Sequence, residues 1–192
     1  MSILDAKIEK FPKWEANFDI QHRLFRTFWS LCWLLLASWT PPPLCAWRRC
    51  LLRLFGAKIS PTARIYGSAN IWYPPNLEMR DHTVLGWKTV CCCMDRVVLE
   101  DYANVAQHSV LLTGTHNIED PNFQLQTKPI YIGRYAWVAA CATVGPGVTI
   151  GEGAVLGGGG VAFKDLEPWT VYAGNPARKV KARKCWKTDA KS

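Results

Sequence analysis

Residues 132–161 read IGRYAW VAACAT VGPGVT IGEGAV LGGGGV, five consecutive blocks of six residues. Each block begins with an aliphatic residue and continues with Gly or Ala, and its fifth residue is small or Val. Six residues supply one short strand and one turn, and three such blocks close a triangular coil with the aliphatic side chains inside. Because one coil cannot bury its own inner face, several coils must stack. The blocks therefore predict a mainly β fold, a left-handed parallel β-helix, in which glycine serves the turn dihedral angles.

The same period extends toward the N-terminus with two interruptions. Aliphatic or sulfur-bearing residues recur six apart in three groups, which are Ile59, Ile65 and Ile71, then Met79, Leu85 and Cys91, then Leu99, Val105 and Leu111. A turn is expected at residues 73–76, and a second slip of two residues precedes Leu99. A long helix would not tolerate so many Gly and β-branched residues, and a globular sheet would show a period of two. Residues 59–161 thus predict about five coils.

One segment within this span lacks the repeat. Residues 113–129 read TGTHNIEDPNFQLQTKP and contain no aliphatic six-residue step. We expect an irregular excursion loop on the rigid β-helix, which is where functional residues tend to lie. The chain then divides into an apolar helical arm over 1–56, the β-helix over 57–165, and a C-terminal cap and basic tail over 166–192.

The arm is predicted to form two helices. Between Arg26 and Arg48 there are 21 residues without a charge, interrupted by three prolines at positions 41–43 that end a helix. Helices are expected near Gln21–Trp39 and Leu44–Phe55, each too short to span a bilayer comfortably. Three alternatives remain open: packing on the β-domain or a neighbouring subunit, peripheral contact with a membrane, and a true span.

Charge and cysteine content limit the classes of partner and the cellular compartment that we expect for this protein. Lys and Arg outnumber Asp and Glu by 23 to 15, and the resulting charge of +8 favours an anionic partner without choosing its class. The basic tail fits either a solvated segment or a ligand contact, and no nucleic-acid-binding motif is present, so no nucleic acid is expected. Eight cysteines lack zinc-type spacing, and Met1–Asn17 has no secretory apolar core. Reduced thiols and a cytoplasmic location are therefore expected.

Four histidines are available for acid–base chemistry. His22 lies in the predicted first helix as a surface or packing residue, and His82 and His108 fall at turn positions of the repeat. His116 stands at the start of the excursion loop. Because irregular loops on a rigid scaffold tend to carry functional residues, His116 is the candidate catalytic histidine.

Four stretches together resemble one family. These are the six-residue blocks, the LLTGTH junction at 111–116, the AWV segment at 136–138 and the closing WTVYAGNPAR at 169–178. They are similar to the hexapeptide-repeat O-acetyltransferases, and above all to the colanic acid biosynthesis acetyltransferases of exopolysaccharide clusters. The resemblance covers about residues 39–178. It implies a homotrimer with acetyl-CoA between subunits, no metal, and His116 as general base for direct attack by a sugar hydroxyl without a covalent enzyme intermediate.

Matching to the family also implies ligand contacts. The positions for CoA fall on Ala140, Gly158, Phe163, Lys164 and Arg178. The small residues would admit the pantetheine arm, and the two cations would meet the phosphates. Trp137 would form one wall of the reaction site; the alternative is that it is an aromatic residue packed at a turn without a role in binding. Asp95 is a candidate to assist in orienting the acceptor.

The chain departs from the family pattern at three places. Residues 87–95 lack the Asn that orients the acceptor in many relatives, Asn117 replaces the Pro common after the catalytic His, and Phe163 stands where Thr is common.

Two other functions stay open from the sequence. A zinc enzyme resembling γ-carbonic anhydrase would use His82 and His116, but residues 118–127 supply no third histidine. A non-catalytic β-helix scaffold is the other alternative.

Overall fold

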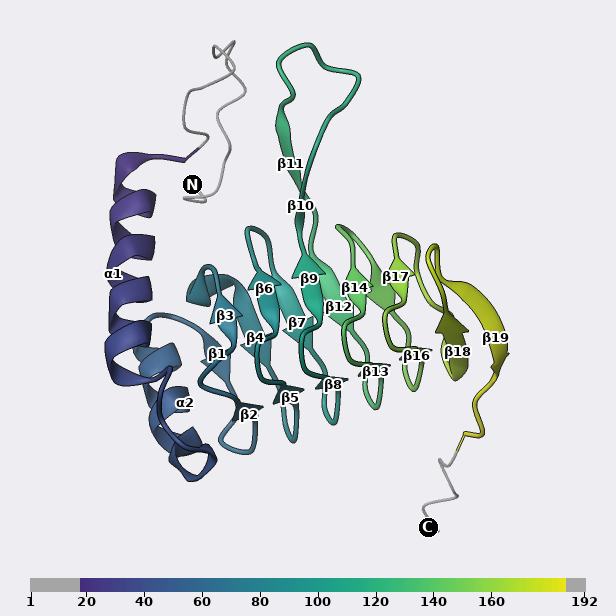
Figure 1. Ribbon diagram of the computed structural model, residues 1–192, viewed down its shortest axis with the longest axis horizontal. Coiled ribbons are helices and arrows are strands. Elements are labelled where there is room, and N and C mark those ends of the chain that lie inside the picture. Colours follow the sequence, from purple (N-terminus) through teal and green to yellow (C-terminus); the bar gives the residue numbers. More distant parts are fainter. Residues whose placement is uncertain (1–17, 186–192) are drawn as a thin grey trace.

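The computed structural model describes residues 18–185 and shows a parallel β-helix with two helices at one end (Figure 1). The predictions made for residues 1–17 and 186–192 lie outside the described residues. Five complete coils stack along one axis, and a further strand begins a sixth coil. The mainly β fold with about five coils, expected from the blocks of six, is thus confirmed.

Each side of the β-helix is a parallel sheet of short strands. Sheet A contains β1 (Lys58–Ile59), β4 (Leu77–Met79), β7 (Val97–Leu99), β12 (Ile130–Ile132) and β15 (Thr149–Ile150). Sheet B contains β2 (Arg64–Ile65), β5 (Val84–Leu85), β8 (Asn104–Val105), β13 (Trp137–Val138), β16 (Val155–Leu156) and β18 (Thr170–Ala173), which pairs antiparallel with β19 (Arg178–Ala182). Sheet C contains β3 (Asn70–Ile71), β6 (Val90–Cys92), β9 (Val110–Leu112), β14 (Thr143–Val144) and β17 (Val161–Ala162).

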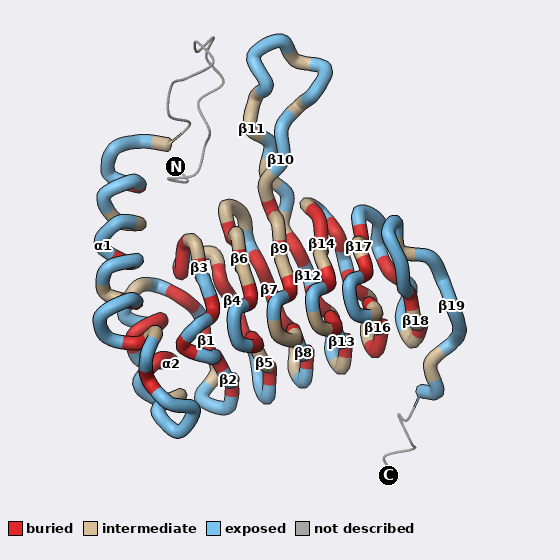
Figure 2. Tube along the Cα trace, viewed as in Figure 1, coloured by how far each residue is buried: buried red, intermediate tan, exposed pale blue. Residues whose placement is uncertain are grey.

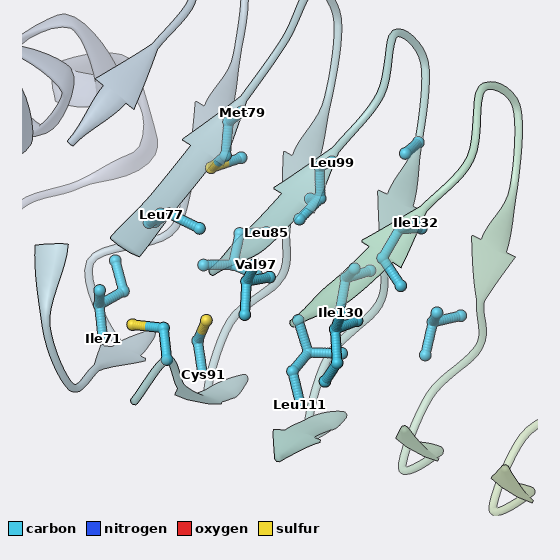
Figure 3. Close-up of a cluster of buried hydrophobic side chains, with 14 of the residues drawn as sticks. Ile71, Leu77, Met79, Leu85, Cys91, Val97, Leu99, Leu111, Ile130 and Ile132 are labelled. Carbon is cyan, nitrogen blue, oxygen red and sulfur yellow. The ribbon is translucent and has the colours of Figure 1, made fainter. Parts of the chain in front are cut away.

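The first residue of each block forms the core. Leu85, Leu99 and Leu111 are fully buried, and Figure 3 shows such side chains from all three sheets meeting inside the prism. The small fifth residues Ala136 and Ala142 are fully buried too. Strands of two or three residues bury enough apolar surface only because every coil adds to one continuous column.

Glycine at the second position of a block has a different role from the one expected. A Cβ on Gly151 would lie 2.6 Å from the carbonyl oxygen of Leu166 in the next coil, so close stacking requires glycine there. The left-handed backbone occurs two residues later, where Gly153 has a φ of +64° and the equivalent Tyr135 has +58°. The turn dihedral angles therefore do not explain the second-position glycines. The offset expected at residues 73–76 contains the 3-10 helix η2 (Pro74–Asn76).

The arm folds into α1 (Ile20–Leu36), the 3-10 helix η1 (Pro42–Leu44) and α2 (Cys45–Leu54). The first helix ends three residues before its predicted end, and Ala37 after it has left the helical conformation with a φ of −129°. In the described part of the chain no helix is long and apolar enough to cross a bilayer. All eight cysteines are free thiols.

The two helices close the open end of the β-helix. β1, β2 and β3 are edge strands, and the outward carbonyls of Ile59, Ile65 and Ile71 have no further coil to pair with. Each carbonyl accepts a hydrogen bond from the arm. Arg53 Nε donates to Ile59 O at 2.8 Å, Arg48 Nε to Ile65 O at 2.7 Å, and Trp29 Nε1 to Ile71 O at 2.6 Å. The arm thereby packs on the β-domain and covers an edge that would otherwise invite pairing with another chain.

Candidate active site

The coils turn three corners, and two of them carry most of the predicted site residues. Corner CA joins sheet C to sheet A and comprises residues 93–96, 113–129, 145–148 and 163–165 in successive coils. Corner BC joins sheet B to sheet C and comprises residues 139–142 and 157–160 in the last two complete coils.

The excursion at corner CA is a β-hairpin and not an irregular loop. β10 (Gly114–His116) pairs antiparallel with β11 (Leu125–Thr127), with His116 opposite Leu125. Figure 1 shows this hairpin projecting well beyond the coils. His116 is therefore carried on an exposed hairpin that connects β9 of the third coil to β12 of the fourth.

The ring of His116 is held in one tautomer. Its Nδ1 lies 2.7 Å from the carbonyl oxygen of Phe123. A carbonyl only accepts hydrogen bonds, so Nδ1 carries the proton and Nε2 of the neutral ring keeps its lone pair. Phe123 has a φ of +50°, and its N–H donates to the carbonyl of Asp120 at 2.9 Å. The hairpin tip thus turns the Phe123 carbonyl back onto the imidazole.

Phe163, Lys164 and Arg178 line one hollow of about 490 Å³ beside β17 and β18. Neither Lys164 nor Arg178 forms an ion pair with any residue between 18 and 185. Lys179, on the same rim, pairs with Glu167 at 2.7 Å, and the hydrogen bond to that carboxylate raises the pKa of the Lys179 ammonium. The hollow therefore presents two cations without an ion pair beside an exposed aromatic ring, and the carboxylate of Asp165, which also lines it, accepts from the N–H of Thr149 at 2.7 Å.

Ala140 and Gly158 adjoin each other at corner BC. The carbonyl of Ala140 accepts a hydrogen bond from Gly159 N at 2.9 Å. A Cβ on Gly158 would meet only the Ala140 oxygen, at 3.4 Å, so the space over Gly158 is otherwise open. This corner is a different one from that of Phe163 and Lys164, so one chain does not gather all five predicted contacts into one place.

Trp137 and Asp95 also lie at different places. Trp137 is in β13, with its side chain 44% exposed on the outer surface of sheet B. Asp95 lies at corner CA below the hairpin, where its N–H donates to Thr113 Oγ1 at 2.9 Å. Its carboxylate accepts from the N–H of Arg96 at 2.6 Å and so caps its own turn.

The remaining histidines have structural surroundings. His82 and His108 adopt left-handed turn conformations, and His82 stacks on Tyr102 at a centroid distance of 4.8 Å. His22 is buried beside Tyr73, and burial followed by the charge of Arg26 lowers its pKa. Among residues 18–185, no three His, Cys, Asp or Glu side chains come together to hold a metal.

The Phe123 carbonyl is the one contact of the site that sequence reasoning missed. A backbone acceptor has no side-chain signature, and its direction depends on the left-handed conformation at the hairpin tip.

Comparison with known proteins places these features in context. No protein-family model matches the chain. It is 36% identical over 157 residues to the acetyltransferase WcaF of Escherichia coli (strain K12), which is named for colanic acid biosynthesis; the match covers 80% of this chain and 86% of that protein.

Two solved structures have similar folds. The hexapeptide-repeat acetyltransferase VCA0836 of Vibrio cholerae, complexed with acetyl-CoA, has a TM-score of 0.75 at 22% identity and is matched over 88% of this chain and 93% of its own. A galactoside acetyltransferase in complex with coenzyme A has a TM-score of 0.77 at 20% identity, over 87% and 84% of the two chains.

Proposed function

The chain belongs to the hexapeptide-repeat acetyltransferases, and from this premise we propose that it moves an acetyl group from acetyl-CoA to a hydroxyl of a sugar or polysaccharide precursor, with His116 as general base. The relative named for colanic acid biosynthesis supports a carbohydrate acceptor.

The observation that carries the proposal is the hydrogen bond between His116 Nδ1 and the Phe123 carbonyl. A sugar hydroxyl is a weak nucleophile until a base removes its proton. With Nδ1 donating to a fixed carbonyl, Nε2 is the free basic nitrogen, and the ring is already oriented when the acceptor arrives. The same bond also favours the imidazolium that forms after proton transfer, because Nδ1–H then becomes a stronger donor.

The reaction balances with this one base. His116 Nε2 takes the hydroxyl proton while the hydroxyl oxygen attacks the thioester carbonyl. The carbon–sulfur bond breaks, and the proton on Nε2 passes to the departing thiolate. The products are an acetyl ester and the free CoA thiol, and no side chain becomes acylated, so the buried thiols of Cys91 and Cys93 have no role as nucleophiles.

The chain offers suitable surfaces for acetyl-CoA, which supplies the activated acetyl thioester. Lys164 and Arg178 have no carboxylate partner in the described chain and would hold phosphates by charge-assisted hydrogen bonds. The exposed ring of Phe163 would pack on the nucleotide end. The open space over Gly158 and Ala140 would accept the slender pantetheine arm. Trp137 and Asp95 are assigned to the acceptor side.

We infer further that three copies assemble around acetyl-CoA. Corners BC and CA of one chain face different directions, and a neighbouring copy would bring one corner of each chain together. A homotrimer would have three times the 21.6 kDa mass of one chain, which light scattering after size-exclusion chromatography measures directly.

The test of the proposed function is thiol release from acetyl-CoA with and without a panel of sugar acceptors. We expect acceptor-dependent release that falls by about 10²–10⁴-fold in His116→Ala, the usual contribution of a general base. His82→Asn is the matched control, because it removes another exposed histidine and Asn tolerates the left-handed turn. Acceptor-dependent release that survives unchanged in His116→Ala would refute the assignment of the base. Absence of both release and acetyl-CoA binding would favour a scaffold without activity.

A further inference from the structure

Helix α1 has a second apolar face that the described chain leaves mostly exposed, although the ring of Phe28 meets that of Phe55 at a centroid distance of 5.7 Å. Trp29 and Trp33 face the β-helix, whereas the opposite side carries apolar residues three or four apart. We call this face the bare stripe, and its side chains are each between 51% and 65% exposed: Ile20, Leu24, Phe28, Leu31, Leu34 and Leu35. Figure 2 shows exposed residues running along the length of α1. A helix that is apolar on both faces has buried only one of them here.

Beyond the end of α1 the apolar surface continues with two exposed tryptophans, one in the turn between the helices and one in the first turn of α2. Trp39 is 71% exposed and Trp47 is 44% exposed. Their indole N–H groups donate to the carbonyls of Leu35 at 2.8 Å and Leu36 at 2.7 Å. The polar atom of each ring is thus satisfied within the arm, and the apolar ring surface faces outward. Tryptophan in such positions is typical of the boundary between water and lipid.

The charge around the stripe is mainly positive. Asp19, the N-cap of α1, is acidic, and between Ile20 and Leu77 the chain contains no Asp or Glu. The same stretch contains seven cationic residues, namely Arg23, Arg26, Arg48, Arg49, Arg53, Lys58 and Arg64. The buried Arg48 bonds only to carbonyl and hydroxyl oxygens, so no carboxylate neutralises it. The bare stripe therefore lies in a positive electrostatic field.

An apolar face in a positive field selects among possible occupants. A second copy of this chain would present the same cations, and like charges would oppose the contact. An anionic bilayer accepts the apolar stripe at its acyl boundary and exposed cations such as Arg23 at its phosphates. We propose that the bare stripe is a docking surface for an anionic phospholipid membrane, on which α1 lies flat. This inference goes beyond acetyl transfer and does not depend on it.

The position of α1 is compatible with a working site on a docked protein. α1 lies across one end of the β-helix, and β18 and β19 lie at the other end (Figure 1). A membrane against the bare stripe leaves the hollow lined by Lys164 and Arg178 facing the aqueous phase. An acceptor attached to lipid would then be held at the surface where this protein docks.

Vesicle co-sedimentation of the full chain tests the proposal. We expect binding to vesicles of phosphatidylcholine mixed with phosphatidylglycerol, and much weaker binding to phosphatidylcholine alone. The double variant Leu24→Gln/Leu35→Gln keeps the charge and should weaken binding by about tenfold for each leucine. Arg23→Gln should weaken it by about fivefold, and only on vesicles with phosphatidylglycerol.

The controls make the same chemical changes elsewhere. Val180→Gln and Lys181→Gln alter an exposed apolar residue and an exposed cation on β19, at the far end of the molecule, and should leave vesicle binding unchanged. The stripe variants leave Trp29 and Trp33 in place, so their thermal midpoint and acetyl-CoA binding should match those of the wild type.

Four results would overturn the proposal. The wild type would fail to bind vesicles that contain phosphatidylglycerol, it would bind both vesicle types equally, or the leucine variant would bind as well as the wild type. In the fourth, the wild type would not bind vesicles but would self-associate, and the leucine variant would abolish that self-association. The last of these would identify a second copy as the occupant.

Discussion

Replacing Arg48 with methionine tests how the arm seals the end of the β-helix. The Arg48 guanidinium is 2% exposed and donates to Ile65 O at 2.7 Å, to Thr40 Oγ1 at 2.7 Å, and to the carbonyls of Thr40, Pro41 and Pro42 at 3.0–3.1 Å. Methionine fills similar space but has no donor.

The expected loss follows from which acceptors keep another partner. The carbonyls of Pro41 and Pro42 also receive the N–H groups of Leu44 and Cys45. The carbonyl of Ile65, on edge strand β2, keeps only a long contact from the Cys45 thiol at 3.8 Å. The carbonyl of Thr40 is the other acceptor that loses its donor. Two unsatisfied buried acceptors cost about 1–3 kcal/mol each, partly offset because a buried charge is removed. We expect a net loss of about 3 kcal/mol.

Urea unfolding followed by tryptophan fluorescence measures this loss. Arg64→Met is the matched control. Arg64 lies on β2 next to Ile65, and its exposed side chain makes no hydrogen bond within residues 18–185. It should change the free energy of unfolding by less than about 0.5 kcal/mol. A loss below about 1 kcal/mol in Arg48→Met would contradict the argument that these hydrogen bonds close the edge.

Three further predictions concern the site and the arm. Gly158→Val should raise the Kd for acetyl-CoA by about tenfold or more without lowering the thermal midpoint, because a Cβ there meets only one protein atom, at 3.4 Å; calorimetric titration and melting together check both parts. Lys164→Gln should weaken CoA binding by about tenfold and make the binding less dependent on salt, whereas Lys181→Gln should bind CoA as the wild type does. Titration with dephospho-CoA identifies which phosphate Lys164 contacts. The lowered pKa of buried His22 means that the unfolded chain binds more protons as the pH falls below about 6.5, so the free energy of unfolding should drop there, and His22→Gln should remove that component of the pH dependence. A pH profile identical in wild type and variant would contradict this prediction, because it would mean that His22 has the same pKa in the folded and unfolded chain.

Periodicity predicted the β-helix because each short strand must turn one side chain into the prism. Ile132, Val138 and Val144 illustrate this, since all three are fully buried at the first position of their blocks. Local chemistry also predicted the break between the helices, where three prolines separate α1 from α2. These inferences need only neighbouring residues, and so they are accessible from the chain alone.

The hairpin was not predicted as strands, for a physical reason. β10 and β11 carry residues that are mostly polar or half-exposed, so no alternating apolar pattern marks them. Their pairing depends on the backbone returning at the right register, which residues 117–124 between them decide. The family resemblance pointed to His116, but the partner that orients its ring is the carbonyl of Phe123.

The sequence by itself determined the repeat, the position of a candidate catalytic histidine and the apolar character of the arm. Only the tertiary structure decided how these parts meet. In the structure, Ala140 and Gly158 lie at a different corner from the hollow beside Lys164, because the number of residues in each coil decides at which corner of the β-helix a given residue lies. The tertiary structure also decided which face of α1 is buried, because the edge carbonyls of the first coil lie where Trp29 and Trp33 reach them and leave the opposite face bare.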